Sequence, residues 1–102
     1  MRNKKTKRLK DTIARVQKME QYFDELLETV DSDPELLRTD ETVRWKLQKL
    51  TEYYENGQWL KDYQCDERGE LPKDLKRGVL SEDGVYNLLC DIAQHENNDM
   101  EI

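Results

Sequence analysis

Apolar residues recur at intervals of three and four from about Asp11 onward, which predicts a long amphipathic helix. Residues with this spacing lie on one face of a helix and form the stripe that packs against the core. The stripe consists of Ile13, Val16, Met19, Phe23, Leu26, Leu27 and Val30. Because the pattern persists for about five turns, we expect a single helix of roughly twenty residues.

Residues 31–35 (DSDPE) predict a break in the chain and the start of a second helix. Ser32 or Asp33 can accept hydrogen bonds from the free amides of the following turn. Pro34 suits the first helical position because it has no amide hydrogen to leave unpaired, and Glu35 complements the helix dipole.

The second helix is expected to end at Asn56-Gly57, where glycine can adopt the left-handed conformation. Residues 39–42 are polar and interrupt its apolar stripe, which predicts a kink or a second helix start near Thr39. The stripe itself consists of Leu36, Leu37, Val43, Leu47, Leu50 and Tyr54.

The last third of the chain mixes short helical patterns with an irregular connection. Residues 58–66 predict one or two further helical turns, and residues 69–78 contain glycines and a proline that disfavour helix. Ser81 is expected to cap a final helix, with Glu82 and Asp83 in its first turn. The apolar stripe of that helix is Val85, Leu88, Leu89 and Ile92.

These patterns predict an all-α fold. The short connection between two long helices favours an antiparallel two-helix hairpin, with a short helix, an ordered loop at 69–80 and a C-terminal helix packed on it. Four apolar residues are expected to hold that loop to the core: Leu71, Leu75, Val79 and Leu80. We divide the chain into a disordered basic arm at 1–10, a single helical domain at 11–94 and a disordered acidic tail at 95–102.

Charge is distributed very unevenly along the sequence. Residues 1–18 carry eight Lys/Arg and one Asp, for a net +7, and the remaining residues carry nine Lys/Arg and twenty-two Asp/Glu, for −13. An acidic body is a poor nucleic-acid surface, so contact with RNA or DNA is expected only through the arm. A solubilising extension is the simpler and favoured interpretation of the arm. Contact with an anionic membrane is disfavoured because the arm lacks aromatic residues and a clear amphipathic shape. The arm's cations are Arg2, Lys4, Lys5, Lys7, Arg8 and Lys10.

Composition also limits the core and the compartment. Only 35% of the residues are hydrophobic and 39% are charged, so the core is thin and a homodimer would help to bury more surface. No apolar run is long enough to span a membrane, and no apolar segment follows the basic arm as in a signal peptide. We therefore expect a cytoplasmic protein with Cys65 and Cys90 as free thiols.

No catalytic or metal-binding motif is present, so neither an enzyme nor a cofactor is expected. A calcium-binding loop that starts at Asp62 fails because Glu67 occupies the position of the required glycine. Paired Glu-x-x-His metal ligands are excluded since His95 is the only histidine. Ser81 and the two cysteines have no histidine placed as a base by any recognisable motif.

Two sets of residues suggest binding instead of catalysis. Lys76 and Arg77 precede a helix start and form a candidate anion site, with an internal salt-bridged turn as the alternative. Aromatic and apolar residues around the loop are candidate interface anchors, because such side chains dominate protein interfaces. The interface candidates are Trp59, Tyr63, Leu71 and Leu75.

The segment from Glu70 to Gly84, which reads ELPKDLKRGVLSEDG, resembles a bacterial family known as domain of unknown function 4298. The likeness extends over roughly Ile13 to Ala93. It implies a small, bacterial, cytoplasmic, all-helical domain, and it implies neither an activity nor any site residues. The sequence therefore favours a non-enzymatic protein-interaction domain, with a nucleic-acid-associated protein or a small-anion binder as alternatives.

Overall fold

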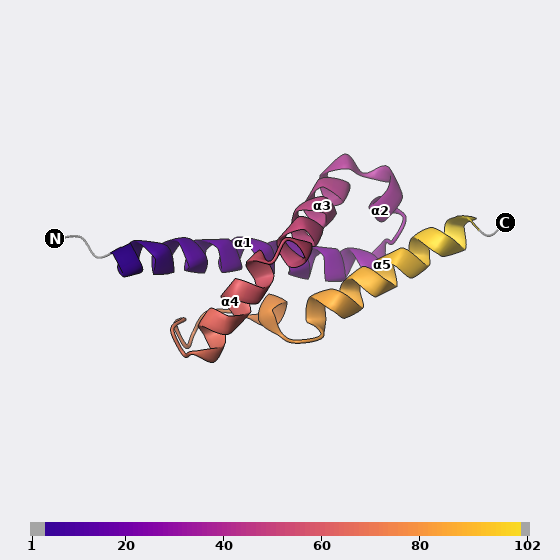
Figure 1. Ribbon diagram of the computed structural model, residues 1–102. Helices are drawn as coiled ribbons and strands as arrows, with labels where there is room; N and C mark the ends of the chain where they lie inside the picture. The colour runs from indigo at the N-terminus through magenta and orange to yellow at the C-terminus, as the bar shows by residue number, and fades with distance from the viewer. Residues whose placement is uncertain (1–3, 101–102) are drawn as a thin grey trace.

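The computed structural model describes residues 4–100, and within this range the side chains of residues 6–95. The described chain is all-helical and contains no strand. Its elements are α1 (Lys4–Ser32), α2 (Leu36–Thr39), α3 (Glu41–Glu55), α4 (Gln58–Glu67), the 3₁₀ turn η1 (Gly78–Leu80) and α5 (Gly84–Met100). The molecule is elongated, with extents of 62 × 24 × 24 Å, and its two ends lie at opposite ends of the long axis (Figure 1).

The long helix α1 forms the spine on which the other elements pack. It contacts α2, α3, α5 and η1. Figure 1 shows α3 crossing α1 obliquely, with α4 continuing beyond the crossing and α5 running back beside the second half of α1. The all-helical class is confirmed. The predicted antiparallel two-helix hairpin is not confirmed, since α3 crosses α1 obliquely (Figure 1).

The polar residues that interrupt the second apolar stripe separate α2 from α3, as predicted. Asp40 has an extended backbone (φ −101°, ψ 119°), and its side chain accepts a 3.0 Å hydrogen bond from the Val43 amide. This is the N-cap geometry that aspartate favours, since it satisfies one of the free amides of the first turn. A second helix therefore starts just after Thr39.

Gly57 ends α3 and begins α4. Its φ of +88° lies in the left-handed region, which side chains with a Cβ rarely adopt. The predicted stop at Asn56-Gly57 is confirmed, and the single glycine redirects the chain into the short helix that carries Trp59 and Tyr63.

The helix ends differ from the boundaries expected from the sequence. Lys4 already begins α1, so the basic segment up to residue 10 is helical over its described part, and Arg2 lies outside the described residues. At the other end, α5 runs to Met100, through most of the segment expected to be an acidic tail. Extending an existing helix requires no new nucleus, and Leu9 packs against the core, which together offset the unfavourable positive charge in the first turns.

The core lies where α1, α3, α5 and the loop meet. Three residues from three of these elements, Val16, Leu50 and Val85, have no exposed surface. All four loop residues expected to reach the core are buried: Leu71, Leu75, Val79 and Leu80. The connection between α4 and α5 is thus part of the packed interior, which confirms its prediction as an ordered loop.

The entry to α5 differs from the predicted cap. Ser81 does not cap the helix, because its hydroxyl donates to the carbonyl of Gly78 at 2.8 Å, and α5 begins only at Gly84. A Cβ at position 84 would lie 2.4 Å from Ser81 Oγ and 3.1 Å from Phe23 Cζ. Glycine is needed here because the chain passes so close to α1.

Candidate functional site

A buried cluster of hydrogen bonds around one ion pair joins α1, α3 and α4. Asp62 of α4 is 1% exposed and accepts hydrogen bonds from Arg15 Nε at 2.9 Å and Arg15 Nη2 at 2.8 Å. It also accepts from the hydroxyl of Tyr53 at 2.7 Å and from the side-chain amide of Gln58 at 3.3 Å. Each carboxylate oxygen thus has two donors, which fully compensates a buried charge.

Two groups in this cluster, Tyr53 and Arg15, have raised pKa values. Burial and the bond to Asp62 raise the pKa of Tyr53 well above its usual range. The bond to Asp62 raises the pKa of Arg15. A general acid or base needs a pKa close to the working pH, and neither group provides one. The cluster therefore acts as a structural clamp that links α1, α3 and α4.

A second buried carboxylate holds the loop against α1. Glu20 is 8% exposed, and its Oε1 accepts a 2.7 Å hydrogen bond from the backbone amide of Val79. On the other side, the indole of Trp59 donates to the carbonyl of Val79 at 2.7 Å. The 3₁₀ turn is thereby fastened from both α1 and α4.

The candidate anion site is an internal salt-bridged turn. Arg77 donates to the carboxylate of Asp66 and to the carbonyl oxygens of Pro72 and Leu75, so its guanidinium closes the loop on itself. Lys76 is exposed and lines a cavity of about 480 Å³ to which Arg77 does not contribute. Asp24, Glu25 and Asp74 also line this cavity. The two cations therefore do not converge on a common anion.

The four interface candidates fall into two groups. Leu71 and Leu75 are 5% and 9% exposed and belong to the core, so neither side chain is presented to a partner. Trp59 and Tyr63 are half-buried, and their rings stack at 5.1 Å with an interplanar angle of 15°. Only this second pair offers a surface for binding.

Two tyrosines extend the stacked pair into a larger aromatic surface. The ring of Tyr54 packs edge-on against Trp59 at 5.2 Å. Tyr86 is 57% exposed, and its pKa is raised mainly by Cys90, with a smaller contribution from Tyr54. We call Tyr54, Trp59, Tyr63 and Tyr86 the aromatic surface.

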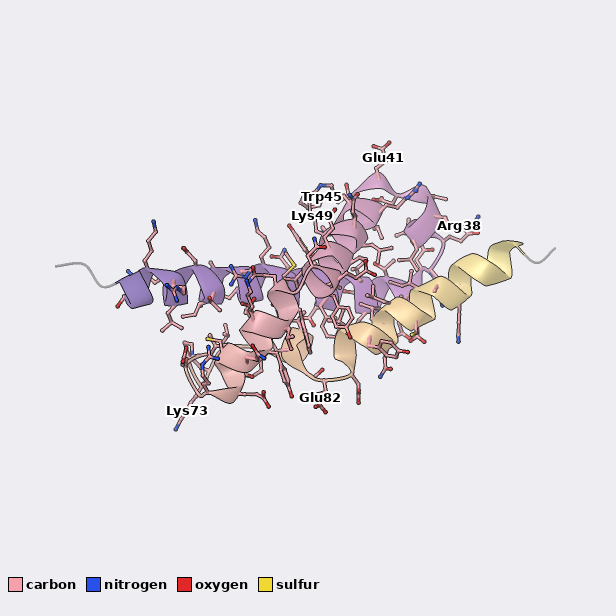
Figure 2. All side chains as sticks on the ribbon, viewed as in Figure 1. Arg38, Glu41, Trp45, Lys49, Lys73 and Glu82 are labelled. Carbon is pink, nitrogen blue, oxygen red and sulfur yellow. The ribbon has the colours of Figure 1, made fainter. Side chains whose placement is uncertain are left out.

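Acidic residues border the aromatic surface. The hydroxyl of Tyr63 donates to Glu82 at 3.3 Å, and burial together with Glu67 and Glu82 raises the pKa of Tyr63. Figure 2 shows Glu82 on the lower edge of the molecule, opposite the side that carries Trp45. The surface therefore combines aromatic rings with negative charge.

The basic segment forms one wall of a groove. A cavity of about 780 Å³ lies between the first half of α1 and α4, and Arg8, Arg15, Lys61 and Arg68 are among its lining residues. Lys7 and Lys10 are exposed on the same helix, and the side chains of Lys4 and Lys5 lie outside the described residues. The helical arm thus presents a regular array of cations where a disordered one was expected.

The remaining reactive side chains of the described residues include the thiol of Cys65 and scattered carboxylates. Burial and the thiol hydrogen bond to Glu70 raise the pKa of Cys65, which disfavours the nucleophilic thiolate. Over residues 4–100, no three His, Cys, Asp or Glu side chains come together in a way that could hold a metal ion. Within the same range no helix is both long and apolar enough to cross a membrane.

Sequence reasoning missed the residues that matter most to this architecture. Glu20 lies four residues after Val16 and three before Phe23, so it occupies a core-facing position of the α1 stripe. Asp62 lies three residues before Cys65 on the buried side of α4. An acidic residue at an apolar position is a signal that could have identified both carboxylates, but nothing local could have identified their partners.

The structure defines an all-helical domain in which two buried carboxylates, Glu20 and Asp62, bind groups that are distant in the sequence. The sequence model of a domain of unknown function (DUF4298) matches residues 16–100, and the chain belongs to that family. The match includes Asp62, Glu20 and the whole loop, but it begins one residue after Arg15, the ion-pair partner of Asp62. No curated protein and no solved structure matches the chain.

Proposed function

We propose that this protein is a non-enzymatic protein-interaction domain that binds its partner through the aromatic surface. The observation that carries the proposal is the contact of the partly exposed Trp59 ring with the rings of Tyr54 and Tyr63, together with Tyr86, which is 57% exposed. Tyrosine and tryptophan anchor protein interfaces because they bury large areas while losing few rotamers.

The chemistry around the rings indicates the kind of partner. Glu67 and Glu82 provide negative charge beside Tyr63. Lysine and arginine side chains bind favourably over aromatic faces and to nearby carboxylates. We therefore infer a partner segment that carries cationic side chains. A second copy of this chain is one such partner, since its own α1 begins with a basic segment.

The double substitution Tyr63→Ala/Tyr86→Ala tests this surface. We expect partner binding to weaken by at least about tenfold, because truncating two interface anchors removes well over 1.4 kcal/mol of binding free energy. The tagged protein is used to capture partners from nuclease-treated lysate, and the affinity of each captured protein is then measured with the purified variants. Light scattering over a range of concentrations measures self-association in parallel.

Trp45→Ala is the matched control. Trp45 is 48% exposed, but it packs against Tyr22 with a centroid distance of 5.7 Å and lies away from Glu82 (Figure 2). Its removal should leave partner binding unchanged. A protein that stays monomeric and retains no discrete partner, or a partner that binds the double variant normally, contradicts the proposal.

A second candidate function is association with nucleic acid through the first half of α1. The observation that favours it is the helical form of this segment, in which Lys7, Arg8 and Lys10 are all exposed. An ordered array of cations can follow a phosphate backbone, and the resulting affinity decreases steeply with salt.

Deleting residues 2–10 tests this second function. We expect binding to a fluorescent single-stranded oligonucleotide, measured by anisotropy at low salt, to be lost in the deletion variant and to decrease with salt in the intact protein. Circular dichroism verifies that the rest of the domain remains folded. Binding that survives the deletion contradicts this function.

A further inference from the structure

The groove between α1 and α4 has the size and composition of a small-molecule site, and it is separate from the aromatic surface. Its volume of about 780 Å³ lies within the usual range for ligand pockets, roughly 300–1,000 Å³. Figure 1 shows α4 diverging from the first half of α1 beyond the point where α3 crosses it. Side chains from both helices line the space between them.

The charges that line the groove do not cancel. Asp62 is fully paired with Arg15, Tyr53 and Gln58 as described above. Glu70 is paired with Arg68 at 2.8 Å and also accepts from the thiol of Cys65. Each of these two carboxylates is balanced by one lining arginine, so the four lining cations and three lining carboxylates leave a net charge of +1.

Two lining cations, Arg8 and Lys61, remain unpaired among the described side chains, and Arg15 keeps a free hydrogen-bond donor there. Arg8 and Lys61 are exposed and make no ion pair with the part of the chain whose side chains are described. The contacts of Arg15 use its Nε and Nη2 atoms, and its Nη1 atom makes no hydrogen bond to the same part of the chain. Arginine and lysine side chains that are not already paired bind phosphate oxygens well.

The remaining lining residues limit the kind of ligand. Gln58 and Gln64 offer amides for hydrogen bonds, and Leu9 offers an apolar contact. No aromatic side chain lines the groove, so a nucleobase would have no ring to stack on. Asp11 is an exposed lining carboxylate without an ion pair in the described structure, and it opposes an anion.

We propose that the α1–α4 groove binds a phosphate-bearing small molecule, whose phosphate is held by Arg8, Lys61 and the Nη1 side of Arg15. The ion pair with Asp62 holds the Arg15 guanidinium in one orientation, and Arg15 is one of the residues that line the groove. This site is independent of the partner proposed for the aromatic surface, because the two share no residue.

Inorganic pyrophosphate is the probe for the test, titrated into the full-length protein by calorimetry at fixed ionic strength. We expect the Arg8→Ala/Lys61→Ala variant to bind it at least about tenfold more weakly, since each lost charged hydrogen bond contributes more than 1 kcal/mol. Asp11→Asn should bind it about two- to threefold more tightly, because it removes a partly screened repulsion.

Lys18→Ala/Arg44→Ala is the charge-matched control, since both side chains are exposed and neither lines the groove. Its affinity for pyrophosphate should equal that of the unmodified protein. Equal losses in the two double variants would mean non-specific attraction to net charge, and the proposal would be overturned. The absence of any binding at millimolar pyrophosphate would overturn it as well.

The Lys7→Ala/Lys10→Ala variant separates this site from the nucleic-acid function. Both lysines lie on α1 outside the groove lining. Pyrophosphate binding should be unchanged in this variant even where oligonucleotide binding is reduced. If pyrophosphate affinity instead decreases to the same extent as in Arg8→Ala/Lys61→Ala, the groove is not the binding site and the proposal fails.

Discussion

Asp62→Ala is expected to lower the free energy of unfolding by about 3 kcal/mol, the largest effect of any single polar substitution in the domain. The change leaves the buried hydroxyl of Tyr53 without its acceptor and the guanidinium of Arg15 without its counter-ion. Breaking one partner of a buried pair typically costs about 3–5 kcal/mol. We expect the lower end of that range because the Arg15 side chain keeps 30% exposure and regains water. Urea denaturation followed by circular dichroism measures the change.

Two further variants separate the ion pair from the rest of the cluster. Tyr53→Phe removes one hydrogen bond and leaves the carboxylate with its other three donors, so its effect should be only about 1 kcal/mol. Adding Asp62→Ala to Arg15→Ala should destabilise less than the sum of the single changes, because each single change leaves an unpaired group. Strict additivity, or a loss below about 1 kcal/mol for Asp62→Ala, would show that the pair contributes little to stability.

Glu20→Ala should have the second-largest effect, a decrease of about 2–3 kcal/mol in the free energy of unfolding. The substitution leaves the amide of Val79, a residue with no exposed surface, without an acceptor, and it leaves a void beside Gly78. Denaturation measures the global change, and hydrogen exchange at the Val79 amide measures the local one. Protection at that amide should decrease more than the average for the core.

Glu20→Gln is the matched control for this contact. A glutamine retains a side-chain oxygen that can accept from the Val79 amide, so we expect it to keep most of the stability and lose only the contribution of the charge. If the alanine and glutamine variants are equally unstable, the carboxylate acts through its charge and not through the bond to the loop. That result would contradict the role assigned to Glu20.

The local pattern of the sequence was sufficient to predict most helices and breaks. Asp40 lies within the polar interruption of the apolar stripe and caps α3, and Gly57 separates α3 from α4. These features depend on residues within four positions of one another, which is the range over which helix signals act. The buried loop leucines were also predictable, since apolar residues within a polar connection have few other places to go.

Long-range contacts could not be predicted in the same way. Arg15 and Asp62 are 47 residues apart, and Glu20 and Val79 are 59 apart. From the sequence alone, Asp62 is one acid among many in a chain with twenty-three, and it was considered only as a metal ligand or a solvated charge. Its partner depends on the angle at which α3 crosses α1, which no local pattern specifies.

The start of α1 was misjudged for a different reason. Positive charge near a helix N-terminus is unfavourable, and residues 4–10 were therefore expected to lack a helix. The unfavourable contribution of such charges is usually less than 1 kcal/mol each and decreases with salt. Continuity with a long helix and the contact of Leu9 with the core are sufficient to balance it.

The backbone of Val79 makes hydrogen bonds to side chains of two different helices, and this affects the order in which the domain folds. Its two bonds come from Glu20 and Trp59, which are 59 and 20 residues away along the chain. Both bonds of Val79 can form only after α1 and α4 have come together, and closing such long segments is entropically expensive. We therefore expect residues 68–83 to become ordered late in folding, after the helices have crossed.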